Sequence, residues 1–175
     1  MEVFLIRHTS VDVPHGTCYG FTDVPLRDTF KEEASITHKN LSGIIFDHVY
    51  SSPLSRATRL AAFCGYLDAE CDNRLKEMNM GNWEMQRFDE ITDDRLQLWY
   101  NDFLNQPTTG GESFLDLYHR VAAFLEELRT KPFQRVAIFA HGGVLICASV
   151  FAGIIPIESG FRHLTPYGGV IKIEI

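Results

Sequence analysis

Short, almost continuously apolar runs alternate with helical patterns along the sequence, and this alternation most constrains the fold. Residues 2–7, 44–52 and 135–141 are apolar runs typical of strands that are buried on both faces. Residues 28–42 and 113–130 are predicted to form helices between them. Strands that alternate with helices indicate an α/β fold with three α/β/α layers and a mostly parallel central sheet.

Local signals predict where the other elements begin and end. Ser52 is expected to cap a helix that starts at Pro53 and ends near residue 67, because Ser suits the N-cap and Pro the first helical position. The remaining predicted elements are a short strand over 73–78, one or two helices over 81–107, a buried helix over 142–154 and a closing strand over 168–175.

Length and composition indicate one domain of a globular protein. The chain has 175 residues, of which 45% are apolar and 22% charged, so residues 1–175 are expected to form a single domain. A helical, lid-like insertion is expected over about 78–112. The net charge of -7 argues against a nucleic-acid partner and against binding to an anionic membrane, but a few focused cations could still bind a small anion.

Signals for export or membrane insertion are not recognisable in the sequence. The first residues, MEVFLIRH, lack the basic segment and cleavable apolar segment of a signal peptide. The most apolar stretch, residues 144–155, is about 12 residues long, whereas a membrane span needs roughly 20. The four cysteines form no CxxC pair, so reduced thiols in a cytoplasmic protein are the expectation.

Cationic and imidazole side chains follow the predicted strands, at the edge of a parallel sheet where ligands bind. Arg7 and His8 end the first strand, Arg56 lies in the first turn after the second, and His141 and Gly142 follow the third. Arginine binds phosphate oxygens bidentately, and a neutral imidazole is a competent nucleophile toward phosphorus. These residues therefore predict a site for a phosphoryl group, which needs no metal if the side chains neutralise the developing charge.

The motifs of the chain resemble those of a known family. IRHT lies near the start, SSPLSRATRLA after the second strand, KEMNMGNWE in the middle, GGES before a helix and AHGG late in the chain. Together and in this order they resemble the histidine phosphatase superfamily. The resemblance implies the phosphoglycerate mutase-like fold and a phosphomonoesterase that acts through a phosphohistidine intermediate.

The resemblance also implies a role for each matching residue. His8 would be the nucleophile that accepts the phosphoryl group, and Arg7 and Arg56 would bind its oxygens. His141 would bind the phosphate and stabilise the transition state. Glu77, in the KEMNMGNWE motif, would protonate the departing alkoxide and then deprotonate the hydrolytic water. The small phosphorylated substrate would be the only partner that this chemistry requires.

Within the superfamily, RHT and GTCYGFTDVPL (residues 16–26) most resemble α-ribazole phosphatases of cobalamin biosynthesis, which dephosphorylate α-ribazole 5′-phosphate. Most members have glycine where this chain has Thr9, and no asparagine of the mutase type lies between residues 9 and 39. Thr9, His15 or the loop over 17–23 could replace that asparagine. Further candidates for substrate contact are Tyr19, which could stack on a flat base, Gly142, and Glu112, which could either cap a helix or orient Arg56.

Several alternatives remain open from the sequence. The protein could be a generalist phosphatase, a phosphoglycerate mutase, or a phospholigand-binding protein without turnover. The apolar tail over 168–175 could be an edge strand that pairs in a homodimer. No HExxH motif or cysteine–histidine cluster is present, so no metal and no cofactor are expected. Four histidines are expected to be surface or structural residues: His38, His48, His119 and His163.

Overall fold

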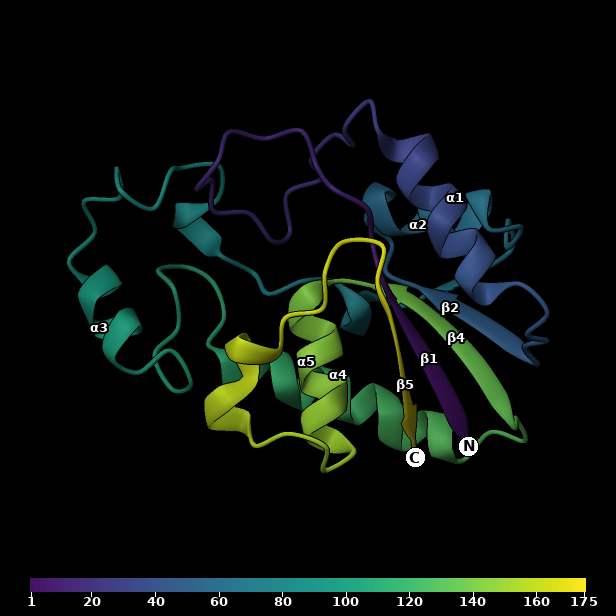
Figure 1. Ribbon diagram of the computed structural model, residues 1–175. Coiled ribbons are helices and arrows are strands. Elements are labelled where there is room, and N and C mark those ends of the chain that lie inside the picture. The colour runs from purple at the N-terminus through teal and green to yellow at the C-terminus, as the bar shows by residue number, and fades with distance from the viewer.

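A computed structural model describes residues 1–175, and it has one five-stranded sheet with the strand order β3-β2-β4-β1-β5 (Figure 1). The β1, β2, β3 and β4 strands run parallel, and β5 pairs with β1 in the antiparallel direction at the edge of the sheet. The strands are β1 (Glu2–Arg7), β2 (His48–Ser51), β3 (Glu70–Cys71), β4 (Arg135–Ala140) and β5 (Val170–Glu174).

Helices cover both faces of this sheet and complete the three-layer α/β/α architecture that the sequence predicted. The α1 and α2 helices lie on one face, and α4 and α5 lie on the other (Figure 1). The α-helices are α1 (Phe30–Leu41), α2 (Ser55–Phe63), α3 (Arg95–Asn101), α4 (Phe114–Arg129) and α5 (Gly142–Phe151). Three 3₁₀-helices are η1 (Asn73–Leu75), η2 (Gly81–Trp83) and η3 (Ile157–His163).

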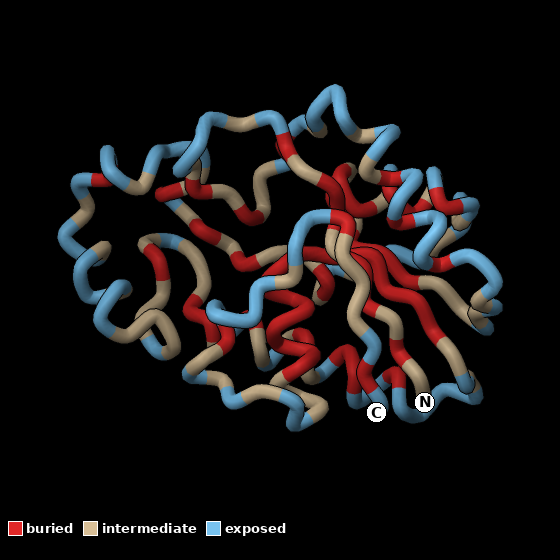
Figure 2. Tube along the Cα trace, viewed as in Figure 1, coloured by how far each residue is buried: buried red, intermediate tan, exposed pale blue.

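Strand β4 shows why the central strands are almost continuously apolar. Its side chains alternate between two cores, because successive residues of a strand point to opposite faces. Val136 and Ile138 pack with α4 and α5, whereas Ala137 and Phe139 pack with α1 and α2. The buried strands lie together at the centre of the molecule in Figure 2.

The two helices on the α4–α5 face begin and pack for identifiable reasons. Ser113 caps α4 through a reciprocal capping box with Asp116, and six apolar residues of the helix are buried. All residues from Gly142 to Ser149 in α5 are buried, which accounts for the apolar stretch in this part of the sequence. No helix of the chain combines the length and the hydropathy that crossing a bilayer requires.

One predicted strand is absent, and one predicted helix is present with a later start. Residues 73–78 do not form a strand, because the Asp72 carboxylate accepts the backbone N–H of Arg74 and turns the chain into η1. The α2 helix begins at Ser55 rather than at Pro53, with Leu54 at its N-cap. The hydroxyl of Ser52, expected at the cap, lies 2.7 Å from Nε2 of His141 instead.

The segment from 78 to 112 projects beyond the sheet and carries η2 and α3 (Figure 1). Where the sequence predicted one or two helices over 81–107, the structure has one short 3₁₀-helix and one short α-helix. Its aromatic side chains pack on one another and on the core, as the edge-to-face contact of Trp83 and Trp99 at 5.8 Å shows. The closing strand β5 lies at the sheet edge, and its pairing in a homodimer stays a prediction.

Candidate active site

The carboxyl ends of β1, β2 and β4 bring together residues that are far apart in the sequence. Arg7 is the last residue of β1, His8 follows it, and Arg56 lies in the first turn of α2. His141 is the N-cap residue of α5, directly after β4. The rings of His8 and His141 meet edge to face with their centroids 5.2 Å apart. The site therefore forms where parallel α/β sheets bind their ligands.

His8 is held with one ring nitrogen occupied and the other free. Its Nδ1 lies 2.7 Å from the carbonyl oxygen of Thr9, and because a carbonyl only accepts, this nitrogen carries the proton. Burial, reinforced by the positive charge of Arg56, lowers the pKa of His8 to about 3, although the bond to Thr9 opposes the shift. The imidazole is therefore neutral near pH 7, and the lone pair on its Nε2 is available as a nucleophile.

Two arginines beside His8 are bound to backbone carbonyls and form no ion pair. The fully buried Arg56 donates from Nη1 to the carbonyl of Thr22 at 2.9 Å and from Nη2 to that of Gly20 at 2.6 Å. Arg7 donates from Nη1 to the carbonyl of Thr165 at 2.6 Å. A cation without a counter-ion is costly to bury, so the buried Arg56 and the half-buried Arg7 favour an anionic ligand.

The buried side-chain atoms that lack a hydrogen-bond partner gather at the same place. Five such nitrogen or oxygen atoms occur in the protein, and four belong to Arg7 (Nε), Thr9 (Oγ1), Arg56 (Nε) and His141 (Nδ1). Native proteins pair nearly all of their buried polar atoms, so a cluster of exceptions marks a binding site. The two arginine Nε–H groups can only donate, which selects a ligand with several acceptor oxygens.

Glu77 lines the same cavity as Arg7 and His8. Its Oε1 accepts the backbone N–H of Met78 at 2.9 Å, and its Oε2 accepts that of Gly143 at 3.1 Å. A Cβ atom at position 143 would overlap Oε1 of Glu77, so a side chain there would have to displace this carboxylate. A side chain on Gly142 would likewise meet Leu164 at 2.5 Å. The structure thus brings Glu77 to the residues that follow β1 and β4.

Glu112 has neither of the two roles expected from the sequence. It does not cap α4, and it does not contact Arg56. Both of its carboxylate oxygens pair with Arg120, at 2.8 and 2.9 Å, and one of them also accepts the backbone N–H of Asn79. Its oxygens are therefore occupied by Arg120 and Asn79, and Glu112 does not line the cavity that contains His8 and Glu77.

Arg120, which the sequence analysis did not single out, binds the backbone that carries Glu77. It donates from Nη1 to the carbonyls of Arg74 and Lys76, and from Nη2 to the carbonyl of Glu77 at 2.7 Å. One available signal was its position on α4 between the buried Leu117 and Phe124, which makes it a lone cation on an apolar face.

Glu84, which the sequence analysis also missed, orders the loop that holds Arg56. Its carboxylate accepts the backbone N–H groups of Gly20, Phe21 and Thr22 at 2.8 to 3.1 Å. Burial opposes ionisation of Glu84, but hydrogen bonds from this loop outweigh it and lower its pKa. The carbonyls of two of these loop residues are the ones that bind Arg56.

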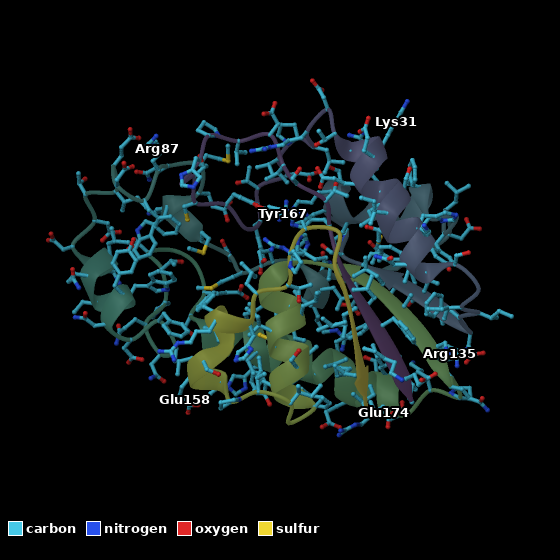
Figure 3. The ribbon with its side chains drawn as sticks, viewed as in Figure 1. Lys31, Arg87, Arg135, Glu158, Tyr167 and Glu174 are labelled. Carbon is cyan, nitrogen blue, oxygen red and sulfur yellow. The ribbon has the colours of Figure 1, made fainter.

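A cavity of about 300 Å³ opens beside His8 and is lined mainly by apolar side chains. Tyr19 lies on its wall, and the hydroxyl of Tyr19 is 2.9 Å from that of Tyr167. Tyr167 lies on the loop between η3 and β5 (Figure 3). The guanidinium of Arg7 lies over the ring of Tyr167, 4.0 Å from its centroid. The aromatic and aliphatic side chains that line the cavity are Met78, Met80, Phe88, Trp99, Phe114, Leu117, Phe161 and Leu164.

The other histidines lie outside this cluster, as expected. His38, His119 and His163 are exposed, and the half-buried His48 bonds to Glu70 at the surface. His15 is also exposed, on the rim of a neighbouring cavity. No three histidine, cysteine, aspartate or glutamate side chains are arranged to hold a metal ion.

The fold and the paired imidazoles and arginines define a class of phosphoryl-transfer protein. The family model of the histidine phosphatase superfamily (branch 1) matches residues 3–175, and the chain belongs to this superfamily. Among solved structures, it is similar to the alpha-ribazole phosphatase from Shigella flexneri. The TM-score is 0.91 and the sequence identity 28%, with 100% of this chain and 91% of the other covered.

Curated relatives of similar identity differ in the substrates that their names give. The chain is 31% identical to the adenosylcobalamin/alpha-ribazole phosphatase of Escherichia coli (strain K12), over 83% of this chain and 75% of the relative. It is 29% identical to phosphoserine phosphatase 1 of Hydrogenobacter thermophilus, over 81% of this chain and 71% of the relative. These likenesses establish the superfamily and leave the substrate to be argued from the site.

Proposed function

We propose that the protein hydrolyses a phosphate monoester through a phosphohistidine formed on His8. Nε2 of His8 attacks phosphorus, the ester P–O bond breaks, and protonated Glu77 gives its proton to the departing alkoxide. A water molecule then gives a proton to Glu77 and attacks phosphorus, the P–N bond breaks, and inorganic phosphate leaves. Arg7, Arg56 and His141 bind the phosphoryl oxygens throughout and offset the charge that develops on them.

The observation that carries this proposal is the cluster of unpartnered polar atoms around a neutral, buried imidazole. A site that only binds an anion, without catalysis, would need only the arginines. A nucleophile also needs a free lone pair, which Nε2 of His8 retains because Nδ1 donates to Thr9. The placement of Glu77 on the same cavity supplies the proton donor that an alkoxide leaving group requires.

We further propose that the substrate is α-ribazole 5′-phosphate, a phosphate monoester that carries a flat, apolar base. The cavity beside His8 has nine hydrophobic residues among its 14, and Arg7 is its only cation. A second anionic group on the substrate, as in phosphoserine or phosphoglycerate, would have no further cation to bind there. Aromatic walls instead favour a ring system, which supports the reading suggested by the α-ribazole phosphatase relatives.

A comparison of substrates tests both levels of the proposal. We expect kcat/KM for α-ribazole 5′-phosphate to exceed that for phosphoserine and 3-phosphoglycerate by at least about 100-fold, because an unpaired buried charge costs several kcal/mol. Equal values would instead identify a generalist phosphatase, and conversion of 3-phosphoglycerate to its isomer would identify a mutase.

Trapping the intermediate tests the mechanism separately. Acid quenching of the wild-type protein during turnover of a ³²P-labelled monoester should leave acid-labile, base-stable label on the protein. His8→Ala should lose both the label and turnover. Undiminished activity of His8→Ala would exclude the phosphohistidine route, and binding without turnover by the wild type would favour a phospholigand-binding protein.

A further inference from the structure

The hydroxyl of Ser52 has only one direction in which it can donate. Ser52 is fully buried, and its Oγ has two neighbours at hydrogen-bond distance. One is the backbone N–H of Leu54 at 3.3 Å, which is a donor and occupies a lone pair of Oγ. The other is Nε2 of His141 at 2.7 Å. The hydroxyl hydrogen therefore points to His141, the only neighbour that can accept it.

The opposite assignment leaves buried groups unsatisfied. If Nε2 of His141 carried the proton, Oγ of Ser52 would accept two hydrogens and its own hydrogen would have no acceptor. Leaving a buried polar group unpaired costs about 1–3 kcal/mol. Burial and the charge of Arg56 also hold the pKa of His141 well below its ordinary value, so the ring is neutral and has a single proton. With Nε2 as the acceptor, that proton is on Nδ1.

Nδ1 of His141 is one of the buried atoms without a protein partner, together with Nε of Arg7 and Nε of Arg56. A proton on Nδ1 makes all three of these nitrogens donors, which matches an anion with several oxygens. A bare lone pair on Nδ1 would instead repel the same oxygens. The tautomer of His141 therefore decides whether this residue attracts or repels a phosphoryl group.

We infer that Ser52 is a positioning residue that fixes His141 as the Nδ1–H tautomer and so makes it a hydrogen-bond donor to the phosphoryl group. This role rests on the phosphatase function proposed above. It gives a functional role to a residue that the sequence suggested only as a helix cap. Ser52 acts through His141 and does not contact the substrate.

Nitrogen NMR of ¹⁵N-histidine-labelled protein reads the tautomer without any substrate. In the wild type, the ¹⁵N shift and two-bond couplings of His141 should identify Nδ1 as the protonated nitrogen and Nε2 as the unprotonated one. Ser52→Ala should move a large fraction of His141 to the Nε2–H tautomer. Ser51→Ala is the matched control, because Ser51 is equally buried but bonds to the carbonyl of Ser52 rather than to His141.

Inorganic phosphate is the probe for the consequence of the tautomer. Loss of one hydrogen bond to a charged group should raise the inhibition constant of phosphate about 10- to 100-fold in Ser52→Ala. Ser51→Ala should change it less than threefold. We expect kcat/KM of Ser52→Ala to fall by a similar factor, because His141 donates to the same phosphoryl oxygens in the transition state.

Two results would overturn the inference: a proton on Nε2 of His141 in the wild type, or an unchanged tautomer and phosphate affinity in Ser52→Ala. The first does not depend on any variant folding correctly. Because the NMR experiment needs no turnover, it separates this inference from the proposed function. A wild-type protein that binds phosphate as the Nδ1–H tautomer but cleaves no monoester would refute the phosphatase proposal alone.

Discussion

Replacement of Arg120 by methionine tests whether one guanidinium holds the backbone of Glu77 in place. Arg120 donates five hydrogen bonds, two to Glu112 and three to the carbonyls of Arg74, Lys76 and Glu77. Methionine retains an apolar stem on α4 but removes every donor. The variant would leave the Glu112 carboxylate with only its bond from Asn79.

The size of the effect follows from the burial of the pair. Removing one partner of a buried ion pair costs about 3–5 kcal/mol, because the other charge stays uncompensated. The Arg120 and Glu112 side chains are 17% and 19% exposed, so water relieves part of this penalty. We expect Arg120→Met to lower the free energy of unfolding by about 2–4 kcal/mol, which corresponds to a fall in Tm of roughly 5–15 °C for a chain of this size.

Urea denaturation followed by circular dichroism measures this loss. Arg129→Met on the same helix is the control, because its pair with Glu126 is exposed and should contribute less than about 1 kcal/mol. Adding Glu112→Gln to Arg120→Met removes the carboxylate charge that has lost its partner. The double variant should therefore lose about 1–2 kcal/mol less free energy of unfolding than the two single variants lose in sum. If Arg120→Met unfolds within 1 kcal/mol of the wild type, the guanidinium does not hold this segment.

Three further outcomes are expected. Gly143→Ala should displace the Glu77 carboxylate and lower kcat about 10- to 100-fold, with a smaller change in KM, in steady-state kinetics. An unchanged kcat would contradict the close approach of residue 143 to the Glu77 carboxylate. Thr9→Val should alter stability by less than about 1 kcal/mol, since its hydroxyl has no protein partner, yet weaken inhibition by phosphate; equal inhibition would mean that Thr9 only packs. Because the pKa values of His8 and His141 are lowered in the folded protein, the unfolded chain binds protons below pH 6.5 that the folded protein does not. The free energy of unfolding should therefore be highest above pH 6.5 and fall by up to about 1.4 kcal/mol per pH unit and residue as the pH drops toward 3. In urea titrations at several pH values, His8→Asn should make this decline less steep, and an identical slope would argue against a neutral buried His8.

The part of the site that the sequence could predict lies directly after strands. Arg7, His8 and His141 each end or follow an apolar run, and Arg56 lies one turn into a helix, so the parallel-sheet rule places all four at one edge. The three-layer fold followed from the same runs, because central strands that are covered on both faces have no polar alternation. Glu77 was reached only through the family motif, since it follows η1 rather than a strand.

Residues that act through hydrogen bonds to distant backbone were not predictable in the same way. Arg120 and Glu84 bind carbonyls or N–H groups more than 40 residues away, and no spacing rule relates them to those partners. Tyr167 reaches Arg7 only because the chain before β5 crosses the ends of the strands. The expected helix start at Ser52 was two to three residues too early, because Leu54 is still extended, and the bond of the Ser52 hydroxyl to His141 could not be read from the sequence.

The position of β1 in the sheet has a consequence for biosynthesis. Its residues pair with Arg135–Ala140 on one side and with Val170–Glu174 on the other, so the strand that precedes His8 has no partner when it leaves the ribosome. At a translation rate of about 5–20 residues per second, this apolar strand stays unpaired for on the order of 10 s. Contacts between such distant segments also slow folding. Residues 2–7 can therefore take their place in the sheet only after residues 135–140 have been synthesised.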